Sequence, residues 1–474
     1  MKVKFFIFLF LLFVSSFPVQ AEDDLKSTLE DQKNVEVTVY NNNLGLVKDT
    51  RVVNLPAGQG NLKFMDVASA INPVTVHIKS LSDPDSLNIL EQNYEYDLIS
   101  PEKLMDKYVG KQIKIIDVNP YQDKKETIEA ILLSNNNGEV YKIGNDIYLG
   151  HPGYKVLPEI PENLMAKPTL TWAYDNKSAK AHELEVSYLT DNINWKADYI
   201  LALNEKDTQA DLSGWVTLDN KSGAAYKEAK LKLVAGEVNR IVDRTLRRRG
   251  GDMAFETMEM QASSPFEEQA FFEYHVYDLQ RRTTIKDNQT KQINLLEASA
   301  VGVNKEFLVR GETHYYMSEY QNPDKKVPVE VSLKFKNAKD NYLGMPLPAG
   351  IVRVYKKDAQ KSLQFVGEDR VKHTPQDEEV SLKIGKAFDV VAERAQTDFQ
   401  VLGRFVNESE WEITLRNHKK EDITVGILEP VHSDWEIVSH SHPYKKNDAF
   451  SIRFDIPVPQ GKEVKVKYRV RTRN

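Results

Sequence analysis

The sequence contains no cysteine. This absence excludes disulfide bonds, thiol catalysis, zinc–thiolate sites and iron–sulfur clusters, so packing and hydrogen bonding must stabilise the fold. A lipoprotein-type anchor is excluded as well, because such an anchor needs a cysteine after the signal sequence. The chain has 474 residues, which is enough for about two to four domains, each with its own hydrophobic core.

Long apolar runs are scarce too. The one that stands out, residues 5–14, follows Lys2 and Lys4 and ends before Ala21, a small residue of the kind that precedes a signal-peptidase cut. A helix that spans a bilayer needs about 20 apolar residues, so this run is too short to be one. We therefore expect a Sec-type signal peptide that is cut between Ala21 and Glu22. The mature protein is then periplasmic or secreted, in a bacterium, and has no membrane span.

The familiar catalytic motifs are also missing. The sequence has no G-x-S-x-G elbow, no H-E-x-x-H helix, no P-loop and no dinucleotide-binding glycine pattern. We therefore predict no catalytic residue and no cofactor. A pair of glycosidase carboxylates cannot be recognised from spacing, because its two acids come from distant positions. The net charge of −7, which becomes −9 when Lys2 and Lys4 leave with the signal, disfavours a nucleic-acid partner.

The chain does contain a regular pattern, in which apolar residues recur at every second position. Apolar and polar residues alternate in short runs separated by turn residues, as in half-buried strands; clear examples are residues 35–40, 74–78, 183–188, 329–335 and 464–470. Asn137-Gly138 lies between two apolar runs and predicts a hairpin, because a type I′ turn needs positive φ at both central residues. The pattern predicts a mostly β protein of tandem antiparallel sandwiches, immunoglobulin-like in type, and small-barrel domains.

One short helix is predicted near residue 101. Ser100 is a good N-cap and Pro101 suits the first helical position. Met105 and Tyr108 give this segment an apolar face before Gly110 ends it.

Composition divides the chain into successive segments. We expect a signal peptide at 1–21, a flexible mature N-terminus at 22–34, an N-terminal β domain at 35–165, a β-sandwich at 166–325 and a C-terminal β-sandwich at 326–474. The middle sandwich carries a segment at about 240–269 that lacks either periodicity and contains a basic and then an acidic half. We interpret that segment as a mobile insertion.

Three histidines come nearest to a metal site. His432, His440 and His442 fall within a short stretch, and two residues at i and i+2 on a strand share a face. Because no carboxylate stands at a ligand-like spacing, we predict no metal site and interpret these as surface histidines. Asp83 and Asp85 lack the other ligands of a calcium loop and predict a turn.

Aromatic residues are the remaining lead. The chain has 21 tyrosines, and the segments 93–97 and 314–316 combine aromatic rings with polar neighbours. If exposed, these rings can stack on sugars or anchor a protein partner. If buried, they are ordinary strand residues, which β-propensity favours.

Several phrases in the second half resemble a known family. They are N-W-K-A-D-Y at 194–199, G-W-V at 214–216, L-G-M-P-L-P-A-G at 343–350, V-R-V-Y at 352–355 and G-K-A-F-D at 385–389. In this order they resemble the mucoidy-inhibitor-A-like proteins, an uncharacterised family with a shared C-terminal domain of unknown function, over about residues 166–474. The resemblance implies a connection with the envelope or with exopolysaccharide, and it brings no catalytic residues with it.

These observations favour an exported, non-catalytic protein that binds or scaffolds at the bacterial cell envelope, with a protein or glycan partner there. The alternative is a carbohydrate-active or other hydrolase whose carboxylates only the fold brings together. A third candidate is an assembly component that offers an exposed edge strand to a partner.

Overall fold

The computed structural model describes residues 25–119, 124–161, 164–236, 238–239, 266–272, 274–321, 325–358, 360–431 and 434–473. Over these residues the protein is mostly β, as predicted, with one α-helix and four short 3-10 turns. The chain divides into two compact units. The described part of the first comprises residues 25–34, 49–69 and 73–187, and that of the second comprises 35–48, 70–72 and 188–473.

The first unit contains a four-stranded sheet in the order β1-β4-β12-β6. Its strands are β1 (Leu25–Ser27), β4 (Gly58–Met65), β12 (Thr169–Asn176) and β6 (Leu87–Glu95). In β12 the side chains of Leu170, Trp172 and Tyr174 are buried and alternate with partly exposed ones, which is the period-two pattern of a strand with one core face. Strand β5 (His77–Ser80) pairs with β13 (His182–Asp191).

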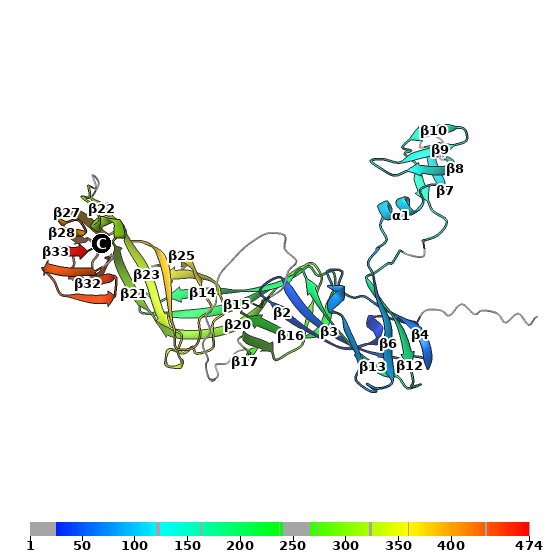
Figure 1. The fold of residues 1–474 in the computed structure, drawn as a ribbon, viewed down its shortest axis with the longest axis horizontal. Coiled ribbons are helices and arrows are strands. Elements are labelled where there is room, and N and C mark those ends of the chain that lie inside the picture. The colour runs from blue at the N-terminus through cyan, green and yellow to red at the C-terminus, as the bar shows by residue number, and fades with distance from the viewer. Residues whose placement is uncertain are drawn as a thin grey trace, which may run out of the picture. The chain divides into compact units, whose positions relative to one another are not determined.

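A separate five-stranded sheet lies between β6 and β12 in the sequence. Its order is β10-β9-β8-β7-β11, and helix α1 (Pro101–Lys107) precedes it. The strands are β7 (Gln112–Asn119), β8 (Lys124–Ser134), β9 (Val140–Ile143), β10 (Asp146–Leu149) and β11 (Tyr154–Val156). Its core is formed by residues 105–157 alone, and Figure 1 shows α1 and these strands as a compact group. We call it the small domain.

Both local predictions in the small domain are confirmed. The Ser100 side chain accepts a hydrogen bond from the backbone N–H of Lys103, at 3.2 Å, and caps α1. Asn137 and Gly138 have φ of 56° and 129° and connect β8 to β9.

The second unit begins with parts of β2 (Gln32–Tyr40) and β3 (Leu44–Val53), which are joined by a turn at residues 41–43. Strands β16 (Tyr226–Ala235), β17 (Phe266–Phe271), β18 (Tyr274–Leu279) and β19 (Thr283–Ile285) extend that sheet, in which β16 pairs with β2, β18 and β19. A second sheet has the order β20-β15-β14-β24-β25. Its strands are β14 (Ile193–Leu203), β15 (Gln209–Asn220), β20 (Gln289–Gly302), β24 (Gly350–Lys357) and β25 (Leu363–Val371).

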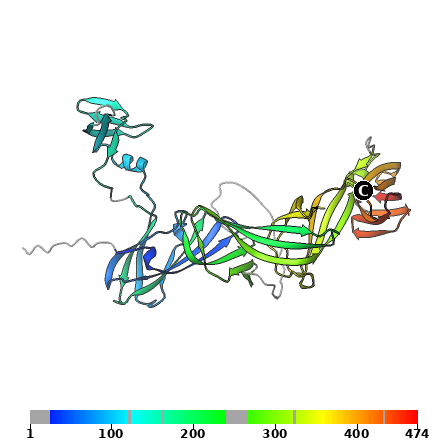
Figure 2. The same ribbon diagram turned by 180° about the vertical axis from the view of Figure 1, so that it is seen from behind.

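The C-terminal part of this unit is a β-sandwich. One sheet has the order β26-β23-β21-β29-β32-β31, with β21 (Asn304–Arg310), β23 (Val329–Lys336), β26 (Glu379–Lys386), β29 (Ile423–Pro430), β31 (Tyr444–Asp448) and β32 (Ser451–Val458). The facing sheet has the order β22-β27-β28-β33-β30, with β22 (Lys326–Val327), β27 (Val390–Gly403), β28 (Val406–Asn417), β30 (Asp434–His440) and β33 (Glu463–Arg473). One hydrophobic core joins the two sheets, and the C-terminus lies in this sandwich (Figure 2).

Some details differ from the sequence-based expectations. Each described sheet has two edge strands and is open, so the expected small-barrel domains are not formed there. The sheets are also mixed, because β1–β4, β2–β16, β14–β24 and β21–β29 are parallel pairs. Such pairs join segments far apart in the sequence, and a local alternation pattern does not reveal them.

The predicted strand at residues 74–78 is wrong in its first half. Pro73–Thr75 forms a 3-10 turn, η2, and β5 begins only at His77. The backbone N–H of Val76 donates to the carbonyl of Pro73 at 3.3 Å, and Val74 is 90% exposed. An exposed valine in a turn has the same sequence pattern as one in a strand.

The N-terminal segment and the proposed insertion are only partly among the described residues. Residues 25–34, expected to be flexible, form β1, the 3-10 turn η1 (Leu29–Asp31) and the start of β2. Of the insertion at 240–269, residues 240–265 lie outside the described residues, and 266–269 belong to β17. Ala21 and Glu22 also lie outside them. No helix in the described part of the chain is long and apolar enough to cross a membrane.

Candidate functional site

The first candidate is a hydrogen-bonded Ser80–His182–Asn176 chain in the first unit. The hydroxyl of Ser80 lies 3.0 Å from His182 Nδ1, and His182 Nε2 lies 3.1 Å from Asn176 Oδ1. The asparagine oxygen can only accept, so His182 Nε2 carries the proton and Nδ1 accepts from Ser80. This is the hydrogen-bond order of a nucleophile, a base and an orienting group.

Burial decides against catalysis by this chain. Its three side chains are at most 3% exposed. Ser80 Oγ also accepts the backbone N–H of Asp83 at 3.1 Å, and Asn176 Nδ2 donates to the carbonyls of Leu55 and Pro56. A reacting carbonyl has no path to the hydroxyl, so the group stabilises β5, β12 and β13 as a satisfied polar network.

A second polar network lies in the core of the C-terminal sandwich. The guanidinium of Arg394 donates to both carboxylate oxygens of Glu429, and Tyr316 donates to Glu429 Oε2 at 2.6 Å. The hydroxyl of Tyr468 lies 2.9 Å from that of Tyr316. Burial raises the pKa of Tyr316 well above its ordinary value, and the neighbouring Glu429 charge adds to the rise.

This second network is also closed to ligands. Arg394 and Glu429 have no exposed side-chain surface, and a Cβ atom at Gly311 would overlap the Glu429 carboxylate. Glycine is therefore required there to leave room for the ion pair. A buried pair of this kind fixes the packing of β27 against β29, and it offers no surface to a substrate.

Of the three candidate histidines, the structure describes His440 and His442. His440 is the last residue of β30, and its Nδ1 donates to the carbonyl of His442, two residues further on, at 2.9 Å. Ser441 Oγ lies 2.8 Å from His442 Nδ1. Across the described residues no three histidine or carboxylate side chains come together in a way that could hold a metal ion; His432 lies outside those residues. Asp83 and Ser86 close the expected turn.

Carboxylates on the solvent-facing side of the β27-β28-β33-β30 sheet form ladders of ion pairs. Arg469 binds Asp398, Glu408 and Glu410, and Arg471 also binds Glu408. Burial alone would raise the pKa of Glu408, but the hydrogen bonds from the two arginines hold it below its ordinary value. Among the described residues every carboxyl group with a resolved shift has a lowered pKa, whereas a general acid of a hydrolase needs a raised one.

The two aromatic segments have different environments. Tyr94 and Tyr96 stack with ring centroids 5.7 Å apart, and Tyr96 is 70% exposed on the surface. Tyr315 and Tyr316 are buried in the C-terminal core, where both rings pack against Trp411. The two tyrosines of the second segment are therefore part of the core, and only the first segment presents a tyrosine ring to solvent.

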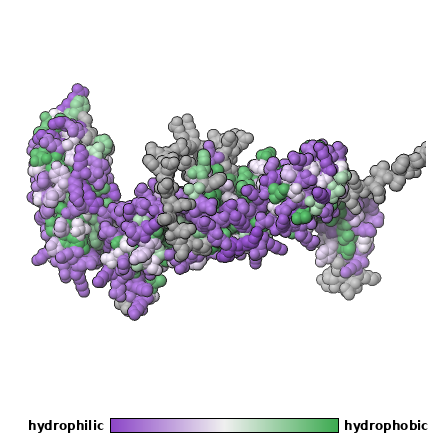
Figure 3. All heavy atoms as spheres, turned by 90° about the horizontal axis from the view of Figure 1, so that it is seen from below, coloured by the Kyte–Doolittle hydropathy of each residue, from purple (hydrophilic) through white to green (hydrophobic). Residues whose placement is uncertain are grey.

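The most unusual exposed surface belongs to the small domain. Its inner face packs Ile113, Ile115 and Leu132 against α1, whereas the outer face carries apolar side chains in the open. Leu149, Tyr154 and Ile147 of that outer face are 86%, 72% and 66% exposed. By contrast, hydrophilic side chains predominate on the face of the molecule drawn in Figure 3.

The register places these residues in rows across the sheet. Ile147 lies opposite Lys142 of β9, which in turn lies opposite Ile131 of β8. Tyr154 lies opposite Ile116 of β7. We call the exposed apolar residues of this side, together with the lysines between them, the outer face; they are Ile131, Leu133, Ile147, Leu149, Tyr154, Val156, Lys114 and Lys142.

One edge of the same sheet is uncovered. All four residues of β10 are exposed, and β9 is the partner strand on its inner side. Natural sheets commonly shield such edges with charges, prolines or bulges. The sequence pattern predicts strands here but does not indicate that one is exposed, because an apolar run at an edge resembles one inside a core.

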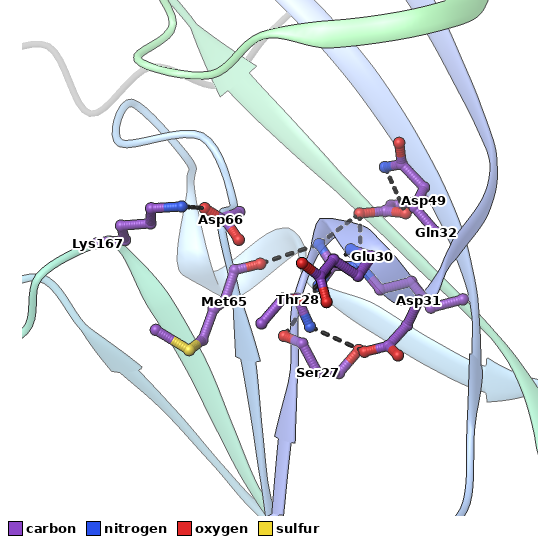
Figure 4. A network of polar contacts seen from close by, with 10 residues as sticks. Ser27, Thr28, Glu30, Asp31, Gln32, Asp49, Met65, Asp66 and Lys167 are labelled. Atoms are coloured by element: carbon purple, nitrogen blue, oxygen red, sulfur yellow. Dashed lines mark hydrogen bonds and ion pairs between the residues drawn. The ribbon is translucent and has the colours of Figure 1, made fainter.

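The start of the described chain is held by Arg51. Its guanidinium donates to Asp49, to the carbonyl of Ser27 at 3.0 Å and to that of Met65 at 2.9 Å. It also lies 3.6 Å from the centroid of the Phe64 ring. Figure 4 shows Ser27, Asp49 and Met65 around this network. These contacts explain why residues 25–27 are a strand despite a polar and charged composition.

Comparison with protein families identifies the second half of the chain. A family model described as "Domain of unknown function (DUF4139)" matches residues 184–473. The shared C-terminal domain of unknown function is therefore present, over a somewhat shorter range than the sequence phrases indicate. No curated protein matches the chain.

Proposed function

The chain belongs to the DUF4139 family, and we propose that it is an exported, non-catalytic binding or scaffolding protein of the bacterial cell envelope. The signal-like first 21 residues support export, and the resemblance to mucoidy-inhibitor-A-like proteins supports the envelope. The small domain supplies the binding surface. Its outer face, with the uncovered strand β10, is the observation that carries the proposal.

Exposure of this kind has an energetic cost that a monomeric module avoids. Large exposed apolar side chains that lie together mark interaction sites more often than scattered single ones do. Leu149 and Ile147 alternate with Tyr148, so the two aliphatic chains lie on one side of β10. When a partner covers these side chains, each Å² of apolar surface removed from water stabilises the complex by about 25 cal/mol.

The partner that fits best is an extended protein segment. Strand β10 offers its free edge to another strand, and the side chains of the added strand then alternate between the two faces of the sheet. On the outer face they lie beside Ile147 and Leu149, and Lys142 of the neighbouring strand β9 lies next to Ile147. We therefore propose a partner strand in which apolar and acidic residues share one face. A glycan partner would need polar groups that converge on a ring, which this flat row of aliphatic side chains lacks.

The hydrolase alternative has little support from the carboxylates. On the sandwich surface Glu393, Glu410 and Glu412 are each paired with an arginine or a lysine. The hydrogen bonds from these partners lower the pKa values of Glu393 and Glu412. Such groups stabilise a sheet face and do not deliver a proton.

A photo-crosslinking residue on β10 tests the binding proposal. At position 147 it points to the outer face, and at position 148, its matched control, it points to the opposite one. We expect a discrete protein adduct from 147 in envelope-producing cells and much less from 148. Leu149→Asp should abolish the adduct, whereas Val74→Asp, at an exposed valine outside the small domain, should retain it.

The outcomes that contradict the proposal are equally specific. Equal adducts from positions 147 and 148, or none from either, would refute the outer face as the binding surface. Turnover of an envelope glycan by the purified chain would favour the hydrolase. If an envelope glycan prevents crosslinking from β10 and is not cleaved, the ligand of the outer face is a glycan and not a protein.

A further inference from the structure

One end of the C-terminal sandwich carries a second exposed apolar group, distinct from the small domain. The hairpin that joins β27 to β28 turns at Arg404 and Phe405, and its apolar residues Val401, Leu402 and Phe405 are 69%, 51% and 60% exposed. They follow one another at the tip, where the pairing has a bulge between Val401 and Gly403. None of the three belongs to the hydrophobic core of the sandwich or is packed against it.

A second turn lies at the same end. The register pairs Val406 with Arg473 and Arg473 with Asp434, which leads from the hairpin tip across β33 to β30. The next residue, Trp435, donates its indole N–H to the carbonyl of Ala449 at 2.9 Å. Ala449 and Phe450 form the turn between β31 and β32, and Phe450 is 57% exposed. We call these two turns, with Trp435 between them, the apolar tip.

The cations at the apolar tip have unusual partners. Arg404 lies 5.4 Å from the centroid of the Phe405 ring, and Lys446 lies 5.0 Å from that of Trp435. Elsewhere on the β27-β28-β33-β30 sheet, the guanidinium groups of Arg416, Arg469 and Arg471 form ion pairs with carboxylates. The two cations at the tip stand on aromatic faces and keep their charge for an external anion.

The carboxylates nearby are already engaged. Asp434 binds Arg473 at 3.1 Å. Asp448 accepts hydrogen bonds from the backbone N–H of Phe450 and from the hydroxyl of Ser451. Within the described part of the chain, the tip therefore combines projecting apolar side chains with two cations that have no carboxylate partner, which is complementary to an anionic surface above an apolar layer.

We propose that the apolar tip inserts into the surface of a phospholipid bilayer that contains anionic lipid. Phe405, Leu402 and Phe450 enter the acyl boundary, Trp435 lies at the interface, and Arg404 and Lys446 bind headgroup phosphates. Turns that project favour a bilayer over a protein partner, because a protein needs a groove or an edge to bind against. This role is independent of the outer face of the small domain.

Vesicle flotation tests the proposal with the chain that starts at Glu22, which contains every described residue. The vesicles are phosphatidylethanolamine with phosphatidylglycerol, and phosphatidylcholine alone. We expect the chain to float with the anionic vesicles, and Phe405→Asp to lower the bound fraction about tenfold or more. Arg404→Glu should weaken binding to the anionic vesicles and change little on phosphatidylcholine.

The matched control is Phe388→Asp. Phe388 is 94% exposed and lies just before β27, at the opposite end of that strand from the tip. It should leave flotation unchanged, and thermal unfolding by circular dichroism should be alike for all three variants. Absence of flotation of the unaltered chain, or an equal loss with Phe388→Asp, would overturn the proposal. A change of oligomeric state with Phe405→Asp, without a change in flotation, would overturn it in favour of self-association.

Discussion

Arg394 and Glu429 form a two-pronged ion pair in which neither side chain has exposed surface. Burial alone would lower the pKa of Arg394, but the Glu429 carboxylate holds it well above its ordinary value. The Arg394 Nε atom is buried without a hydrogen-bond partner. The pair therefore contributes little net stability over apolar residues, but each member depends strongly on the other.

We predict that Glu429→Gln lowers the free energy of unfolding by about 3–5 kcal/mol, because it leaves an uncompensated buried guanidinium. The double change Arg394→Met with Glu429→Gln should recover much of this loss, since no charge remains and the amide still accepts from Tyr316. Lys33→Met, which breaks the exposed pair with Glu183, should cost about 1 kcal/mol or less. Urea unfolding of the four proteins measures this. Equal losses for the single and double variants would contradict it.

The hydrogen-bonded group Ser80–His182–Asn176 is predicted to contribute to stability and not to catalysis. Ser80→Ala removes the donor to His182 Nδ1 and the acceptor for the Asp83 N–H, so we expect a loss of about 1–3 kcal/mol. Ser86→Ala, which removes a hydroxyl bound to the carbonyl of Asp83, is the control and should cost less. Thermal unfolding measures both. A hydrolytic activity that Ser80→Ala abolishes while stability is unchanged would show that the chain is a catalytic triad.

Arg51 gives a prediction for the start of the mature chain. Arg51→Met keeps the apolar contact with the Phe64 ring but loses the hydrogen bonds to Ser27 and Met65, and it leaves Asp49 buried without its cation. We expect global destabilisation of about 3 kcal/mol or more. Amide exchange at residues 25–27 should accelerate further than exchange in β12. Uniform acceleration in both strands would mean that β1 is held by other contacts.

The sequence predicted elements whose cause is local. Ser100 caps α1, and Asn137-Gly138 turns the hairpin, because each depends on residues next to it. The sequence did not predict contacts between distant residues. Ser80 and His182 lie 102 positions apart, and nothing in either neighbourhood shows that the other is near.

The exposure of side chains is the other feature that a short stretch of sequence does not predict. Residues 25–34 have a polar composition that predicts flexibility, yet Arg51 and β4 order their first part. Conversely, Ile147 and Leu149 look like core residues but lie on an open sheet face. Burial depends on which segments pack on a strand, and that is decided by the tertiary fold.

The ion-pair ladder predicts acid sensitivity. Glu408 has a lowered pKa in the folded chain, because the arginine hydrogen bonds outweigh the effect of burial. A depressed folded pKa adds stability above the unfolded value, and that stability is lost as the pH falls through the folded one. We therefore expect the urea concentration at the unfolding midpoint to decrease as the pH is lowered past about 5. In Arg469→Met this decrease with pH should be less steep. A pH dependence identical in the two proteins would assign the acid sensitivity to other groups.

The first 21 residues give a prediction about export. If residues 1–21 are a signal peptide, the exported chain begins at Glu22, three residues before β1, and keeps every residue that pairs with β4. We expect intact-mass measurement of protein from the periplasm or medium to give a chain that starts at Glu22. Ala21→Leu should shift or block the cut, because signal peptidase needs a small residue there, while Gln20→Asn, one position earlier, should not. Recovery of the full-length chain from the cytoplasm alone would refute both the signal peptide and the proposed envelope role.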